Sequence, residues 1–427
     1  MSSLAPSGYT HVHRISILVS TMLGFAFDVY DLLIFPFVMP SIQRSLELSL
    51  GEVASISSIT LVGSTLGGLF FGWLADRIGR RTTLQLTLAI VGVGAILSAM
   101  SQGYWSLSIT RFVAGLGLGG EWAAGMVLFN EVWSRERRGL GSAIVQGSAV
   151  FGTASVPIVA TWAIGTFGDD MGWRVSLLSG AAPLLLAALI RFLIPESAVW
   201  KQQEAERRKN QLRENAVARQ NTVGILLRPP HIFQFIKALL WAMSFMYFYY
   251  GMATFMPTLM LQTMNTPPET VRTVVLLASV TGGVAFLCMG WLNDRLGRRI
   301  GAVIPALIWL VAVAGFCLYG GILYAGSLVA WPFFWLYLSN AIGNSGVGVF
   351  GPWLSELFPT EIRATATSAV YMIGRGAGAT SPLIVPLVAE STGSLLIGML
   401  SGAPFIILYL LLTFSMRETA GRNLKAD

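Results

Sequence analysis

The stretch GWLADRIGRR at residues 72–81 decides the fold of this chain, because it returns as GWLNDRLGRR at residues 290–299. Eight of the ten positions are identical, and each copy forms a short charged loop between two long apolar segments. A second echo pairs EVWSRERRG at 131–139 with ELFPTEIRA at 356–364. Repeats at matching places in the two halves of a chain are typical of an internal duplication. We therefore expect two halves that repeat one architecture in parallel.

Apolar segments long enough to cross a lipid bilayer surround these loops. Of the 427 residues, 54% are hydrophobic and only 11% are charged, whereas a soluble domain carries about 25% charged residues. Because about 20 apolar residues span the hydrocarbon core of a bilayer, the sequence predicts an all-α membrane protein with twelve transmembrane helices. The expected spans are residues 15–39, 52–74, 83–101, 105–130, 140–165 and 173–194 in the first half, and 232–262, 272–292, 301–321, 327–350, 364–388 and 395–415 in the second.

A polar segment at residues 195–230 separates the spans into two sets of six. We interpret it as a cytoplasmic linker between an N-terminal bundle, residues 1–194, and a C-terminal bundle, residues 231–427. The net charge of +7 does not indicate nucleic-acid binding, because the basic residues lie in short loops between spans. This distribution follows the positive-inside rule. It predicts a multi-pass protein of the inner (plasma) membrane with both termini in the cytoplasm.

The duplicated loop motif and the expected twelve spans resemble the major facilitator superfamily. The resemblance covers essentially the whole chain and implies two pseudo-symmetric six-helix bundles that rock around a central cavity. RFVAGLGLGGEW at 111–122, YMIGR at 371–375, PES at 195–197 and RETAG at 417–421 further resemble the proton-coupled organic-acid symporters, which include sialate, lactate and aromatic-acid groups. DVYD at 28–31 keeps the spacing of an aspartate pair in the aromatic-acid group but lacks the glycine of that motif.

The residue types of the loop motif fit a role in gating. Gly72 and Gly79 allow close helix approach and a tight turn, and Asp76 can pair with arginines or cap a helix N-terminus. Such contacts latch one conformation of a transporter and do not bind its substrate. The residues expected to take part in gating are Gly72, Asp76, Arg77, Gly79, Arg80, Asp294 and Arg295.

Charged residues inside the first and fourth spans are candidates for proton coupling, because ionisable groups are costly inside a membrane. Asp28 and Asp31 are three residues apart and share one helix face, and two nearby carboxylates hold a proton more readily than one. The alternative is that one aspartate only pairs with Arg111 and holds the two spans together. Glu121 is either a second proton site or a partner for arginines of the cytoplasmic gate.

Arg375, near the middle of the eleventh span, breaks the repeat, because its expected counterpart in the fifth span is Val150. A planar guanidinium binds a carboxylate through two hydrogen bonds, so we expect Arg375 to hold an anionic substrate. The alternative is a structural pairing with a backbone carbonyl or with Glu356, which lies at a different depth in the membrane. Polar neutral residues either line the same cavity or hold helices together; they are Tyr371, Gln146, Asn340 and Asn344.

An aromatic run in the seventh span has two interpretations. Its rings either shape the cavity or face lipid, and we expect them to face lipid. The members of the run are Trp241, Phe245, Tyr247, Phe248, Tyr249 and Tyr250.

Patterns for cofactor chemistry do not fit this sequence. GLGLGG at 115–120 resembles a dinucleotide fingerprint, but it lies inside an expected membrane span without a preceding strand. We expect these glycines to permit close helix packing instead. The sequence has neither a phosphate-binding loop nor a set of catalytic or metal-binding residues at the required spacing, so we expect no enzyme activity, no cofactor, no metal and no ATP-driven transport.

These residues together predict a proton-coupled symporter that imports a small organic acid by alternating access. Asp28 and Asp31, with Arg111, would take the proton, and Arg375 would take the carboxylate. The expected partners are a small organic anion, the proton and the lipid bilayer, and we expect a monomer. The alternatives are a sugar or polyol carrier of the same superfamily and a drug exporter, although the fifth-span motif of such exporters is absent from residues 147–157.

Overall fold

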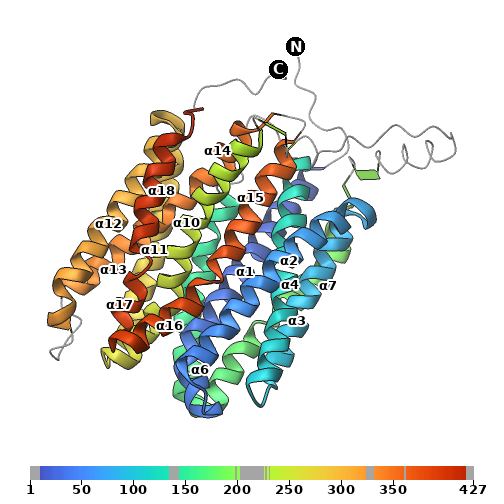
Figure 1. Ribbon diagram of the computed structural model, residues 1–427. Helices are drawn as coiled ribbons and strands as arrows, with labels where there is room; N and C mark the ends of the chain where they lie inside the picture. Colours follow the sequence, from blue (N-terminus) through green and yellow to red (C-terminus); the bar gives the residue numbers. More distant parts are fainter. Residues whose placement is uncertain are drawn as a thin grey trace.

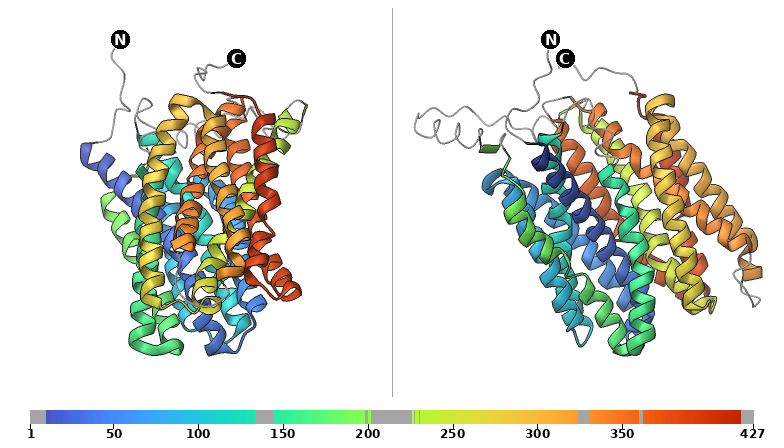
Figure 2. Two further views of the ribbon diagram at one scale, coloured as in Figure 1. Left: turned by 90° about the vertical axis from the view of Figure 1, so that its left-hand side faces the viewer. Right: turned by 180° about the vertical axis from the view of Figure 1, so that it is seen from behind.

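Long helices run side by side through the whole molecule in the computed structural model (Figure 1). The structure describes residues 10–133, 144–197, 200–201, 226, 228–229, 231–323, 331–359 and 362–419, and these residues form helices and no strands. The start of α1 and the end of α18 lie at the same end of the bundle (Figure 2), as an even number of crossings requires. Most of the predicted linker and of the first copy of the second echo lies outside the described residues.

The helices of the first half pack closely through glycines. The elements are α1 (His11–Leu46), α2 (Leu50–Ile78), α3 (Arg80–Ala99), α4 (Tyr104–Val132), α6 (Ala149–Ser179) and α7 (Pro183–Leu193). Gly67 of α2 and Gly119 of α4 face the partner helix so closely that a Cβ on either would overlap its backbone. Glycine therefore lets α2 and α4 approach, which is the packing role expected for the run at 115–120.

The second half contains more breaks in its helices. Its elements are α10 (His231–Thr258), the π-helix η2 (Leu259–Thr263), α11 (Pro268–Leu296), α12 (Arg298–Leu323), α13 (Trp331–Gly343), the 3-10 helix η3 (Asn344–Val349), α14 (Phe350–Leu357), α15 (Arg363–Gly378), α16 (Ser381–Thr392), α17 (Leu395–Leu400) and α18 (Ala403–Ser415). Short π and 3-10 segments inside longer helices often mark bends or functional positions. Here η2 forms the end of the seventh expected span, and η3 interrupts the tenth.

Ten helices in the described part of the chain are long and apolar enough to cross a membrane. One of them, Ile144–Ile190, covers the fifth and sixth expected spans and bends at Gly168, whose φ of 75° lies in the left-handed region. The tenth expected span is broken where α13 gives way to η3 and then to α14. With these two regions counted, the helices agree with the twelve-span architecture expected from the sequence.

The expectation that the aromatic run of the seventh span faces lipid is wrong. The Trp241 ring packs on Phe350 of α14 with ring centroids 4.2 Å apart, and its Nε1 donates a hydrogen bond to Thr413 of α18 at 2.9 Å. The run therefore belongs to the core between α10, α14 and α18. Its fully buried members are Trp241, Phe245, Tyr247 and Phe248.

The two halves of the chain meet along four pairs of neighbouring helices: α1 with α10, α2 with α15, α2 with α16, and α6 with α11. Small residues bring the halves together, since a Cβ at Gly68 of α2 would lie 2.5 Å from the Met372 sulfur of α15. Near the end of α1, the Gln43 side chain accepts a hydrogen bond from Gln262 of η2 at 3.1 Å. The helices that carry most of the candidate residues, α1, α4 and α15, lie at this boundary.

Candidate functional site

Asp31 and Arg111 form a buried ion pair between α1 and α4. Arg111 Nη2 lies 2.5 Å from Asp31 Oδ2 and Nη1 lies 3.2 Å from Oδ1, so the pair is bidentate. Nη2 also donates to the backbone carbonyl of Asp31 at 3.2 Å. The side chains of Arg111 and Asp31 are 0% and 1% exposed. This geometry favours the structural alternative, in which the pair holds the first and fourth spans together.

Asp28, Glu121 and Arg375 form a second group of buried charges, at the boundary between the halves. They come from α1, α4 and α15 and are 3%, 1% and 5% exposed. The Asp28 carboxyl lies within electrostatic reach of both Glu121 and Arg375, and Glu121 lies within reach of Arg375. The structure therefore combines two carboxyls and one guanidinium in a region of low dielectric, where each charge strongly affects the others.

Two side chains in this group have unused hydrogen-bonding capacity among the described residues. Nε of Arg375 has no acceptor, and the oxygens of Glu121 have no donor. The Asp28 carboxyl lies within hydrogen-bonding reach of Glu121, so one proton can bridge the two acids. Buried polar atoms are nearly always paired, because an unpaired one has lost its water without replacement. The group can therefore hold a proton between Asp28 and Glu121 and has unused capacity for an acceptor oxygen at Arg375.

Glycine in α1 makes room for the Glu121 carboxyl. A Cβ at Gly24 would overlap Glu121 Oε1, and a Cβ at Gly125 would lie 3.3 Å from the same atom. Gly24 therefore positions Glu121 beside α1, and sequence reasoning missed it. The available signal was a small residue about one helical turn before Asp28 on the same helix.

Three tyrosines lie near the Arg375 guanidinium. Tyr371, one turn earlier on α15, lies within its electrostatic reach, as do Tyr249 and Tyr250 of α10. The Tyr371 ring also stacks on Trp122 of α4, with ring centroids 4.7 Å apart and planes inclined by 11°. Since α4 and α15 belong to different halves, this stack joins the halves directly beside the charged group.

The three predicted amide residues are not among the groups that act on Arg375. Among the described residues these groups include Tyr250, Tyr371 and Asp28, whereas the amide residues are Gln146, Asn340 and Asn344. The side-chain oxygens of the two asparagines are buried without a partner in the described ranges, and the backbone carbonyl of Asn340 accepts a hydrogen bond from Trp309 at 3.0 Å. A role for these amides in substrate binding stays a prediction.

The two copies of the loop motif fold alike. Gly79 and Gly297 both have φ of 103°, a conformation that favours glycine. In the first copy Glu196 accepts hydrogen bonds from the backbone N–H groups of Arg80 and Arg81 at 2.9 and 3.1 Å. A carboxylate thus caps the start of α3, where the helix dipole favours negative charge.

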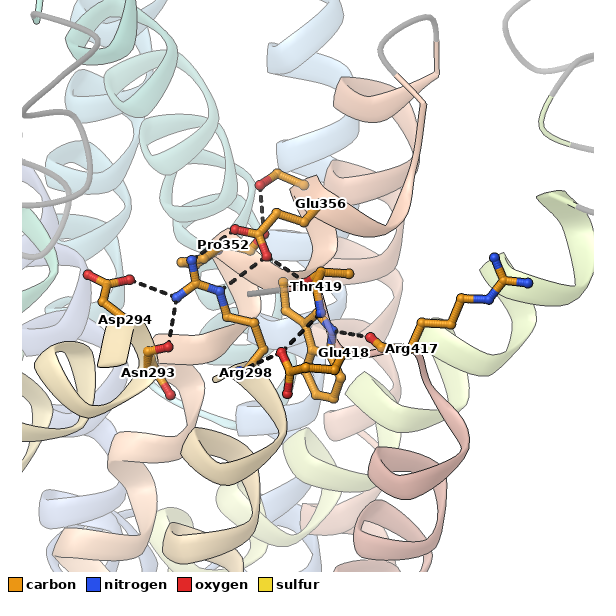
Figure 3. A network of polar contacts seen from close by, with 10 residues as sticks. Asn293, Asp294, Arg298, Pro352, Glu356, Arg417, Glu418 and Thr419 are labelled. Atoms are coloured by element: carbon orange, nitrogen blue, oxygen red, sulfur yellow. Dashed lines mark hydrogen bonds and ion pairs between the residues drawn. The ribbon is translucent and has the colours of Figure 1, made fainter. Parts of the chain in front are cut away.

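The second copy belongs to a larger polar network (Figure 3). Glu418 accepts a hydrogen bond from the backbone N–H of Arg298 at 2.9 Å, and so caps α12. The Arg298 guanidinium pairs with Asp294 at 2.7 Å and with Glu356 at 2.9 Å. Thr419 donates to Glu356 at 2.6 Å. This network ties together one end of each of α11, α12 and α14 and the residues that follow α18.

The remaining predicted gating residues make different contacts. The Arg77 guanidinium lies 4.0 Å from the ring centroid of Trp73, and Arg295 lies 4.3 Å from that of Trp291. Gly72 is half-buried in α2, and the side chain of Asp76 lies outside the described part of the structure. The two cation–π contacts repeat between the halves at equivalent positions of the duplicated motif.

Sequence reasoning missed the acidic partners of the loop motif. Glu196 and Glu418 cap equivalent helices, and Glu356 pairs with Arg298. A signal was present, because Glu196 and Glu418 each follow the last span of a half within similar short motifs.

Comparison with known proteins gives the family. Residues 21–382 match the Major Facilitator Superfamily. The chain belongs to the major facilitator superfamily. This superfamily member is 29% identical to a probable 4-methylmuconolactone transporter of Cupriavidus pinatubonensis, over 87% of this chain and 82% of that protein. It is 26% identical to a cis,cis-muconate transport protein of Acinetobacter baylyi, over 93% of each chain. It is 25% identical to a sialic acid transporter of Escherichia coli, over 88% of this chain and 87% of that protein.

A solved structure shows the same fold for this superfamily member. The inward-open xylose transporter of E. coli superposes with a TM-score of 0.76 over 96% of this chain and 98% of that chain, at 19% identity. This likeness and the family match confirm the expected major facilitator fold. The relatives named above are transporters by their printed names.

Proposed function

We propose that this superfamily member is a proton-coupled symporter that imports a small organic acid across the inner membrane. The observation that carries the proposal is the buried group of Asp28, Glu121 and Arg375, in which two carboxyls lie within hydrogen-bonding reach of each other and Nε of the guanidinium lacks a partner among the described residues. Such groups inside a membrane protein mark substrate and proton pathways. The names of two relatives specify muconate and sialic acid, and both compounds are carboxylic acids.

The charges of the group suggest how proton and acid are coupled. With one proton shared between Asp28 and Glu121, the remaining carboxylate balances Arg375 and the group is neutral. When a monocarboxylate binds Arg375, a second proton restores neutrality. Because an uncompensated charge is costly inside the membrane, only the two neutral states change readily between outward and inward access. Each monocarboxylate therefore crosses with one proton.

In this proposal Asp31 and Arg111 have a structural role and do not carry the proton. Their bidentate pair is neutral by itself and excludes solvent, so it contributes a fixed contact between α1 and α4. That contact holds Asp28 and Glu121, which lie on the same two helices, at a constant separation. Of the four residues predicted for proton coupling, Asp28 and Glu121 thus carry the proton.

Uptake by proteoliposomes tests the proposal. Labelled acids and sugars are supplied with and without an inward proton gradient, and protein-free liposomes correct for passive diffusion. We expect acid uptake that rises with the gradient, is lost in Arg375→Ala and is weakened in Arg375→Lys, because lysine keeps the charge but not the bidentate geometry. Sugar uptake that ignores the gradient and survives Arg375→Ala would favour the sugar or polyol carrier instead.

The same proposal includes the topology of the chain. Residues 1–194 form the N-terminal bundle, 195–230 the cytoplasmic linker and 231–427 the C-terminal bundle, with both termini in the cytoplasm. The basic loops support this orientation. A reporter that is active only outside the cytoplasm, fused after residue 427, should be inactive, and an active fusion would reverse the orientation.

A further inference from the structure

A small cavity lies between α1 and α10, directly beside the charged group. Its volume is about 40 Å³. Leu32, Leu33 and Pro36 of α1 line it on one side, and Tyr249 and Tyr250 of α10 line it on the other. The two helices belong to different halves and pack against each other. The cavity is therefore enclosed by surfaces that separate when the halves move.

Tyr249 and Tyr250 connect this cavity to the Arg375 guanidinium. Both lie within electrostatic reach of Arg375. The Tyr250 ring is held against α15, because it packs on Gly378, where a Cβ would overlap the ring. Arg375 and Gly378 are three residues apart on α15 and so lie on neighbouring positions of one face. A carboxylate at Arg375 would thus extend the rest of its molecule along the Tyr250 ring into the cavity.

The walls of the cavity are mostly apolar. Aliphatic and aromatic side chains predominate, and three of the eight lining residues carry a hydroxyl: Tyr249, Tyr250 and Thr254. A ligand with several hydroxyls would lose its hydrating water there and find few partners, and buried polar groups without partners oppose binding. A hydrocarbon chain or an apolar ring would lose no hydrogen bonds to water there, and its burial would favour binding.

We infer that this cavity receives the body of the transported acid, and that the substrates are monocarboxylic acids with a compact apolar body and not polyhydroxy acids such as the sialic acid named for one relative. The inference rests on the proposed function, because it assumes that Arg375 holds the carboxylate. The present volume is close to the share of one water molecule in the liquid, about 30 Å³. An acid therefore enters when α1 and α10 part, and the apolar walls close around it.

Two acids of equal length and charge test the inference. Hexanoate has an unsubstituted chain, and gluconate has the same number of carbons with hydroxyls on five of them. Dissociation constants are measured by titration calorimetry on the purified full-length chain in lipid nanodiscs. We expect hexanoate to bind at least about tenfold more tightly than gluconate. Leu33→Phe fills the cavity and should weaken the binding of hexanoate about tenfold. Leu23→Phe is the control on the same helix, because Leu23 is 43% exposed, and it should not change the binding.

A second variant covers the case in which Leu33→Phe does not fold. Leu33→Ala enlarges the cavity and should shift the preference from hexanoate toward octanoate. If gluconate binds as tightly as hexanoate and Arg375→Ala abolishes that binding, the apolar cavity is not the substrate site, but the proposal of acid transport still holds. If neither acid binds better to the wild type than to Arg375→Ala, both the cavity and the proposed carboxylate site are contradicted.

Discussion

Asp28 and Asp31 stand on the same helix but have different partners. Asp31 is in a complete bidentate pair with Arg111, whereas Asp28 lies near Glu121 and Arg375. We expect Asp31→Asn to lower the free energy of unfolding by about 3–5 kcal/mol, because it leaves Arg111 buried without its counter-charge. Thermal unfolding in detergent measures the effect. The double variant Asp31→Leu/Arg111→Leu should be more stable than Asp31→Asn, and the reverse order would show that the pair is not structural.

The double variant Asp28→Asn/Glu121→Gln should separate proton coupling from acid binding. Each amide resembles a permanently protonated carboxyl, so the acid-bound site stays neutral and the variant should still exchange labelled for unlabelled acid across the membrane. It should lose uptake driven by a proton gradient, because neither side chain can take up or release a proton. The single variant Asp28→Asn should keep this uptake, because Glu121 still titrates. Counterflow and gradient-driven uptake are measured in the same proteoliposomes, and gradient-driven uptake by the double variant would contradict the assignment of the proton to these two carboxyls.

The sequence predicts the charged residues of the site but not how they pair. Asp28, Asp31, Glu121 and Arg375 are recognisable because ionisable residues inside spans are costly. Three residues along a helix rise by about 4.5 Å and turn by about 300°, so the two aspartates point about 60° apart and can meet different neighbours. Which neighbours they meet depends on helix rotation, and this is set by contacts such as that of Gly24 with Glu121, which a single sequence does not reveal.

At the scale of the helices, turn geometry makes a separate prediction. Gly79→Ala should destabilise the chain by about 1–3 kcal/mol, because alanine at φ of 103° is strained and its Cβ would overlap Glu196. Gly51→Ala is the matched control near the other end of α2, where a Cβ meets nothing within 4 Å. It should be neutral or stabilise by up to about 1 kcal/mol. Thermal unfolding of both variants checks this, and equal losses would contradict the turn argument.

The sequence predicts the positions of the helices along the chain better than it predicts which side of each helix is buried. The spans and the duplicated loop could be predicted because length and hydropathy determine them. The orientation of Trp241 could not, since buried and lipid-facing surfaces of a membrane helix are both apolar. The break before η3 at Asn344 also left no hydropathy signal, because the residues that follow Asn344 are small and mostly apolar.

At the scale of the whole molecule, the charged group and its contacts link the two halves. Asp28 and Glu121 belong to the first half and Arg375 to the second, and the stack of Trp122 on Tyr371 joins the halves at the same place. Binding of an acid to Arg375 therefore changes the electrostatic attraction between the halves. The internal repeat predicts two such halves, but it does not predict that the guanidinium comes from one and the carboxyls from the other.

The ratio of protons to acid molecules tests the central claim most directly. Proteoliposomes with an internal pH dye receive a labelled monocarboxylate while potassium and valinomycin set the membrane potential, and Arg375→Ala liposomes give the background of passive diffusion. The charge balance of Asp28, Glu121 and Arg375 predicts about one proton per monocarboxylate and uptake that does not change with potential. A ratio near zero, or uptake that follows the potential and not the pH gradient, would contradict proton-coupled acid import by this site.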